Sequence, residues 1–307
     1  MTSLEVKQAV RELFPELCER LSKTRVVGRH LAEIYQKTKD AQDVFLANDL
    51  LGDLGIQLSL LDFEAERHKE DPATFFQPIP ESELPTVHWE RPRFWKADSV
   101  DKDPVLRIER NLSEALNAVW STYHYSGQGQ PWVACKNLKT IRFTAEWSFK
   151  RPYRWVAIDE AEVRHETDLP ASMPHLTFKV MNHIDAQDSL SRGEVLAITT
   201  YMEGHLKLLH YFDHYFFPIQ VISMFHSGAR ILQAYHDGKT LKISMSKLYD
   251  LSGNDNIETY TLLARWMYSK PCGDTAAPLE VEPIALDGHY KRKLEKMLYS
   301  AFKKTMT

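Results

Sequence analysis

Residues 192–250 read RGEVLAITTYMEGHLKLLHYFDHYFFPIQVISMFHSGARILQAYHDGKTLKISMSKLYD, the longest stretch of the chain with an unambiguous pattern of secondary structure. Its first part places apolar residues at helical spacing, which predicts an amphipathic helix that begins at Arg192 and ends before Pro218. The run 219–225 is short, apolar and rich in β-branched residues, as is typical of a strand buried on both faces. The dipeptide Asp-Gly at 237–238 separates two alternating runs and favours a hairpin with a type I′ turn.

The sequence on either side of this stretch extends the same pattern. Helical spacing and period-two alternation predict a helix, three strands and two further helices, at 107–123, 141–150, 154–163, 175–181, 256–268 and 291–303. This order of elements is typical of the mixed α/β class. We therefore expect residues 105–307 to form an α/β core with C-terminal helices.

The N-terminal part has a different character. Residues 1–68 carry apolar residues at helical spacing and are predicted to be a helical region, with a kink or a break at Pro15. Such an apolar stripe is most often core packing, and it could also form the interface of a homodimer. Residues 69–104 hold six prolines and several large aromatic residues, which indicates a connector that packs along a domain surface.

Composition excludes several functional classes. The chain has 307 residues and a net charge of -4, so it has no general attraction to nucleic acid or to an anionic membrane. No apolar run approaches the roughly 20 residues of a membrane span. The three cysteines lie far apart and show no CxxC spacing, which favours reduced thiols. We expect an intracellular protein, cytoplasmic or nuclear, without membrane association.

Two resemblances follow from these motifs. The run 218–251, continued by LLARWMYSKPCGDT at 262–275, resembles the C-terminal half of a large group of uncharacterised fungal proteins, which implies no activity. The order helix, three strands, helix, strand resembles the core of PD-(D/E)xK nucleases, the restriction-endonuclease-like fold. That resemblance implies a divalent metal held by an Asp on the second strand and by a Glu two residues before a Lys on the third.

The nuclease resemblance assigns candidate residues. Lys179 matches the lysine of the third strand, Asp159 or Asp168 matches the upstream acid, and Glu114 matches an acid of the first helix. Thr177 stands where the metal-binding carboxylate is expected. Residues two apart on a strand share a face, and a neutral hydroxyl is a poor ligand for a hard divalent cation. The resemblance therefore implies an inactive nuclease or one whose acid has moved.

A second candidate site lies on the helix after Arg192. Glu203, His210 and His214 share a helical face, and the two histidines repeat the i, i+4 spacing that binds Zn²⁺. The same stretch is rich in aromatic residues, and histidines in such surroundings often complete hydrogen bonds in the core.

A third candidate is a basic run that interleaves with aromatic residues. Its proposed binding residues are Lys139, Arg142, Lys150, Arg151 and Arg154. Such cations neutralise phosphates, and exposed rings can stack on bases. Strict alternation would instead bury the rings and leave a solvated, charged strand face.

These observations favour binding over catalysis. The chain has no Walker loop, no GxGxxG and no GxSxG motif. We expect an intracellular protein with a nuclease-like core that lacks a complete metal site and binds nucleic acid or a protein partner. The alternative is an enzyme that acts on a small molecule, with a metal site formed by Glu203, His210 and His214.

Overall fold

The computed structural model describes residues 3–64, 74–81, 103–125, 132–134, 145–146, 153–163, 173–208, 211, 213–253 and 256–304. Its helices are α1 (Ser3–Asp40), α2 (Asn48–Asp53), α3 (Pro104–Tyr125), α4 (Arg192–Leu206), α5 (Ile257–Met267) and α6 (Gly288–Lys304). Its longer strands are β1 (Ile56–Leu60), β5 (Trp155–Val163), β6 (Leu176–Asn182), β7 (Ile219–Met224), β8 (Gly228–His236) and β9 (Leu241–Met245). The short strands are β2 (Phe76–Gln77), β3 (Trp132–Ala134), β4 (Ala145–Glu146), β10 (Tyr249–Asp250) and β11 (Lys270–Pro271).

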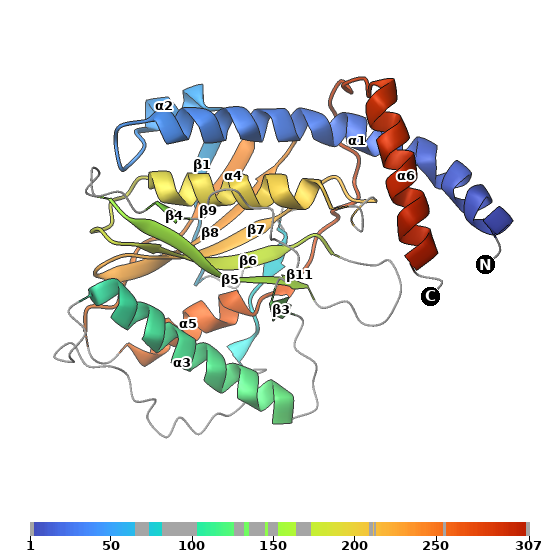
Figure 1. The fold of residues 1–307 in the computed structure, drawn as a ribbon. Coiled ribbons are helices and arrows are strands. Elements are labelled where there is room, and N and C mark those ends of the chain that lie inside the picture. The colour runs from blue at the N-terminus through green and yellow to red at the C-terminus, as the bar shows by residue number, and fades with distance from the viewer. Residues whose placement is uncertain are drawn as a thin grey trace.

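Helices cover both faces of one mixed sheet, which confirms the predicted mixed α/β class (Figure 1). Helix α4 lies on one face and α1 lies outside α4, while α3 and α5 cover the opposite face. Helix α6 crosses the N-terminal part of α1. This part of α1 inclines away from the rest of that helix. Pro15 lies inside α1, so the sequence-predicted kink takes the form of one bent helix.

Strand order in the sheet is β1-β9-β8-β7-β6-β5-β3 within the described residues. Strand β6 runs parallel to β7, and α4 connects them, whereas β5–β6, β7–β8 and β8–β9 are antiparallel pairs. Every residue of β6 and β7 is buried. The predicted doubly buried strand over 219–225 is thus confirmed, because helices cover both of its faces.

Two apolar layers flank the sheet. Leu176, Phe178 and Val180 of β6 point into the layer shared with α4 and α1. The alternate residues of β6 point the other way, and there Met181 joins the layer that α3 and α5 form. The first layer also contains Val27 of α1, so residues of the predicted N-terminal helical region and of the predicted core share one apolar cluster.

A buried ion pair fixes the N-terminus of α4. Ser191 and Glu194 form a capping box, in which each side chain accepts a hydrogen bond from the other residue's backbone N–H. Glu194 also forms an ion pair with Arg230 of β8, and both side chains are almost fully buried. Arg230 donates further hydrogen bonds to the carbonyl oxygens of Gln187 and Ser189, each at 2.9 Å. The strand β8, the loop before α4 and α4 itself are therefore tied together.

Two sequence predictions are wrong in this part of the fold. Residues 56–60, predicted as helix, form β1, because Gly55 has a φ of 68° that ends the preceding helix and the strand then pairs in parallel with β9. The predicted hairpin exists between β8 and β9, but its loop has four residues, 237–240, where a type I′ turn has two central ones. The Asp237 carboxylate accepts the N–H groups of Lys239 and Thr240 and closes that loop.

A helix that crosses a bilayer needs about 20 consecutive, mostly apolar residues. None of the helices within the described ranges is long and apolar enough to cross a bilayer.

Gly193 provides a test of the packing of α4 on the sheet. A Cβ atom at this position would lie 2.6 Å from Cγ of Trp155 and closer still to the hydroxyl oxygen of Tyr153, and both of these rings are buried. We expect Gly193→Ala to lower the free energy of unfolding by about 1–3 kcal/mol in urea denaturation, as overpacking does.

Gly52 of α2 is the matched control for this substitution. A Cβ atom there meets no atom within 4 Å, so Gly52→Ala should leave stability unchanged or raise it by up to about 1 kcal/mol. Equal effects of the two substitutions would contradict the close packing of α4 on Trp155.

Candidate functional site

Lys179, the lysine that the nuclease resemblance singles out, is completely buried in the middle of β6. Its ammonium lies 3.0 Å from Oε1 of Glu109 and 2.8 Å from Oγ of Ser113, both on α3. Ser113 in turn donates a hydrogen bond of 2.6 Å to the same Glu109 oxygen. Among the described residues, Lys179, Glu109 and Ser113 therefore form one hydrogen-bonded network between the sheet and α3.

Thr177 points to the same side of the sheet as Lys179, as their spacing on the strand predicts. Its hydroxyl contacts the sulfur of Met267 on α5 at 3.4 Å, and its side chain is buried. Helices α3 and α5 therefore cover both residues that the resemblance places in a catalytic cleft.

Among the described residues, the acid beside Lys179 is Glu109, which was not one of the predicted candidates. Glu114 is exposed on α3, whereas Glu109, five residues earlier on the same helix, makes the ion pair. Asp159 belongs to β5, where the pairing register with β6 shifts, but its side chain lies outside the described residues, as does all of Asp168. A signal for Glu109 was present in the sequence, because Glu109 and Ser113 form an i, i+4 pair beside the apolar stripe of their helix.

The predicted zinc site is altered by the length of α4. The helix ends at Leu206 and does not continue to Pro218, because the chain turns there and brings Tyr211 and Phe217 into the core. Glu203 faces Lys207 at 2.6 Å, which leaves its carboxylate in an ion pair at the surface. No group of three potential ligands lies together within the described residues, and His210 is outside them.

His214 instead takes part in a core contact. Its Nδ1 lies 2.7 Å from the hydroxyl of Thr275, and its Nε2 lies 3.3 Å from a carboxylate oxygen of Asp213. Its backbone carbonyl accepts a hydrogen bond from the buried Arg20 of α1. This placement corresponds to the core role that was the alternative to zinc binding.

Of the five cations of the basic run, only Arg154 lies within the described residues. Arg154 is exposed, while the rings of Tyr153 and Trp155 on either side are buried against α4. These two rings therefore cannot stack on bases, and Arg154 is left as a charge at the surface. Lys139, Arg142, Lys150 and Arg151 lie outside the described residues.

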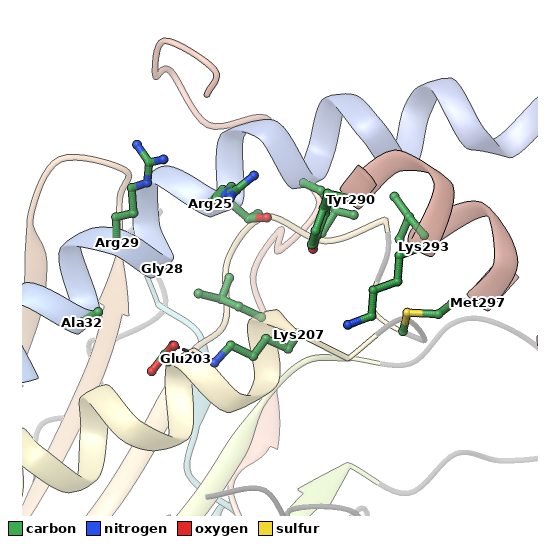
Figure 2. A pocket seen from close by; sticks show the side chains of 13 residues that line it. Arg25, Gly28, Arg29, Ala32, Glu203, Lys207, Tyr290, Lys293 and Met297 are labelled. Carbon is green, nitrogen blue, oxygen red and sulfur yellow. Dashed lines mark hydrogen bonds and ion pairs between the residues drawn. The ribbon is translucent and has the colours of Figure 1, made fainter. Parts of the chain in front are cut away.

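A hollow that the sequence did not predict lies between α1, α4 and α6 (Figure 2). Its volume is about 520 Å³, within the roughly 300–1,000 Å³ of small-molecule sites. Leu206 and Leu294 form part of its apolar lining, and Gly28 on α1 adds no side chain to it. Cationic residues from all three helices surround it, namely Arg25, Arg29, Lys207 and Lys293. No short motif encodes this hollow, because three segments distant in sequence contribute to it.

Two buried histidines are held neutral by their surroundings. Burial lowers the pKa of His175 to about 4 and that of His236 to about 3, in the second case assisted by the neighbouring His30 ring. Nδ1 of His236 accepts the N–H of Gly238, so the ring carries its proton on Nε2 and donates it to Nδ1 of His30 at 2.7 Å. This bond ties α1 to β8.

Comparisons of the chain with protein-family models, with curated proteins and with solved structures found no match. Any functional conclusion therefore depends on the geometry of the sites themselves.

The ion pair of Lys179 with Glu109 leads to a prediction about the free energy of unfolding. Lys179→Met leaves the Glu109 carboxylate largely buried without its partner, and we expect a loss of about 2–4 kcal/mol in unfolding free energy. The double variant Lys179→Met, Glu109→Leu should recover at least about 1 kcal/mol of that loss, because no uncompensated charge remains.

Glu114→Gln, on the same helix but exposed, is the control and should change stability by less than about 0.5 kcal/mol. A Lys179→Met variant as stable as the wild type would contradict a structural role for this lysine.

The neutral state of His175 and His236 leads to a prediction about how the free energy of unfolding depends on pH. The unfolded chain binds protons at its histidines near the ordinary pKa of 6.5, whereas folded His175 and His236 bind them only near pH 4 and 3. Their contribution to stability is therefore complete above about pH 6.5 and is lost as the pH falls below it, by about 1.4 kcal/mol per pH unit for each histidine.

Urea denaturation between about pH 7.5 and pH 4.5 measures this slope. His236→Asn should reduce the slope by roughly half, since one of the two groups is removed. His289→Gln, an exposed position on α6, should leave it unchanged, and an unaltered slope in His236→Asn would refute the assignment.

Proposed function

We propose that the protein is an intracellular binding protein that engages the phosphate backbone of nucleic acid and does not hydrolyse it. Its core would be a restriction-endonuclease-like fold whose third-strand lysine has become structural. The proposal rests above all on Lys179, whose ammonium is buried and bonded to Glu109 and Ser113. A lysine in this position cannot approach a substrate phosphate or an attacking water without opening the layer of α3.

The arrangement of elements supports the ancestry of the core. Helix α3 precedes an antiparallel pair, β5 and β6, and α4 then leads into β7, which runs parallel to β6. The described chain has four strands between α3 and α4, β3 to β6, where the nuclease resemblance implies three, and Lys179 is on the last of them, the strand before α4. Thr177 in place of the metal-binding carboxylate supports the loss of hydrolysis, because a neutral hydroxyl attracts a divalent cation weakly.

The basic run supports nucleic acid as the partner. Five cations lie between Lys139 and Arg154 in a chain whose net charge is negative, so any attraction to phosphate must be local. The buried rings at Tyr153 and Trp155 favour contacts with the backbone over stacking on bases. An intracellular location agrees with Cys18 and Cys272, which are free thiols.

Binding to labelled single-stranded and duplex DNA and RNA over a range of salt concentrations tests this proposal. We expect binding that weakens with salt and no cleavage after incubation with Mg²⁺ or Mn²⁺. Replacing the five cations by Gln should lower the slope of log K against log salt by roughly 0.7–0.9 for every cation that contacts a phosphate. The five are Lys139, Arg142, Lys150, Arg151 and Arg154.

A control variant removes the same charge elsewhere, from exposed positions on α1 and α6: Lys7, Arg11, Lys291, Arg292 and Lys296. It should retain binding. Metal-dependent cleavage, or no binding at low salt, would overturn the proposal. Stoichiometric zinc that is lost in His210→Ala would instead favour the alternative, an enzyme that acts on a small molecule.

A further inference from the structure

The hollow between α1, α4 and α6 carries an inference beyond the proposed function. It lies on the far side of α4 from the sheet, and none of its lining residues belongs to the basic run or to the Lys179 network. Gly28 is open to it, since a Cβ atom there would meet no atom within 4 Å. A ligand could therefore reach the surface of α1 directly at this point.

The charges around the hollow are unbalanced. Lys207 is paired with Glu203, and Figure 2 shows both at the edge of the space, Glu203 on α4 and Lys207 directly after its last residue. Lys293 extends into the space from α6, and among the described residues it has no ion-pair partner. The Arg25 guanidinium lies over the Tyr290 ring, 5.2 Å from its centroid, and interacts electrostatically with the Asp287 carboxylate, so Lys293 and not Arg25 is the cation that remains for a ligand. An anionic group is the complement to this arrangement.

The remaining lining is apolar. Leu206 and Leu294 are buried in its wall, and Met297 is 42% exposed, one of few large apolar side chains in the described part of the chain that solvent reaches so freely. An alkyl chain that crosses the hollow between Met297 and Gly28 would remove Met297 from water and would lie against the buried leucines of the wall. The volume of about 520 Å³ suits a small molecule, whereas a stable protein partner would require an interface of about 800 Å² per side.

We propose that this hollow binds a single-chain carboxylate of the fatty-acid type. The carboxylate lies at the ammonium of Lys293, and the alkyl chain runs from the side of Met297 across the apolar lining towards Gly28. Charge-assisted pairing with Lys293 selects the acid, and burial of the chain supplies most of the affinity. Neutral and cationic molecules with the same alkyl chain lack the charge-assisted pairing with Lys293.

Calorimetric titration of the full-length protein with dodecanoate, dodecanol and dodecyltrimethylammonium, each below its aggregation concentration, tests the assignment. We expect dodecanoate to bind at about one molecule per chain and at least about tenfold more tightly than the other two, as an ionic hydrogen bond predicts. Lys293→Gln should weaken dodecanoate by about tenfold and leave dodecanol unchanged. Lys296→Gln, an exposed lysine of the same helix that does not line the hollow, is its control and should change neither.

A second variant fills the hollow. Gly28→Leu should abolish dodecanoate binding without lowering the thermal stability, because the new side chain enters open space and leucine favours the helix more than glycine does. Gly52→Leu, at a glycine of α2 that is equally open, should bind like the wild type. The proposal is overturned if dodecanoate fails to bind at concentrations up to about 1 mM, if dodecanol binds equally well, or if Gly28→Leu folds and still binds.

Discussion

The parallel pairing of β6 with β7 is the constraint on which the rest of the structure depends. Parallel neighbours cannot be joined by a tight turn, so a crossover is required, and α4 supplies it. The crossover covers one face of the sheet, and α3 and α5 cover the other, so both strands are buried on both sides. Every polar group on these two strands consequently has to find its partner inside the protein.

The polar residues of the central strands meet this requirement in different ways. Asn182 bonds to Tyr153 and Ser223, and Gln220 bonds to Gln233 and to the carbonyl oxygen of Trp266. Lys179 requires a charge as its partner, since an isolated ammonium at this depth would cost several kcal/mol. Glu109 provides that charge from α3, so the same burial that stabilises the sheet withdraws this lysine from solvent.

The sequence predicts those elements whose signals are local. Strands β5 to β9 and helices α3, α5 and α6 follow from periodicity, and the shared face of Thr177 and Lys179 follows from spacing along one strand. Strand β1 was missed because its partner, β9, lies more than 180 residues away and supplies the hydrogen bonds that make it a strand. The end of α4 was missed because helical spacing continues in the sequence at Leu209, Phe212 and Phe216. In the structure, Tyr211 and Phe217 are buried in the core instead, and the chain turns to place them there.

The same distinction applies to the sites. Sequence spacing can identify a lysine on a strand, but it cannot rank Glu109 above Glu114, because both lie on α3 and only the packing of that helix on β6 selects one of them. The hollow is a still less local feature, since α1, α4 and α6 meet there from three distant parts of the chain.

The position of the hollow follows from the way in which the helices are layered. Helix α4 uses one side to cover the sheet, and its other side receives α1, so its last turn at Glu203 and Lys207 is left facing outward. Helix α6 packs on the N-terminal part of α1 through Leu294 and Leu298, and it therefore meets the end of α4 obliquely and leaves a gap. Because α1 presents Gly28 at that gap, the gap is not filled by a side chain. The polar groups of Asn182, Gln220 and Lys179 on the central strands are bonded inside the core, so the ligand site that we propose lies among the helices outside it.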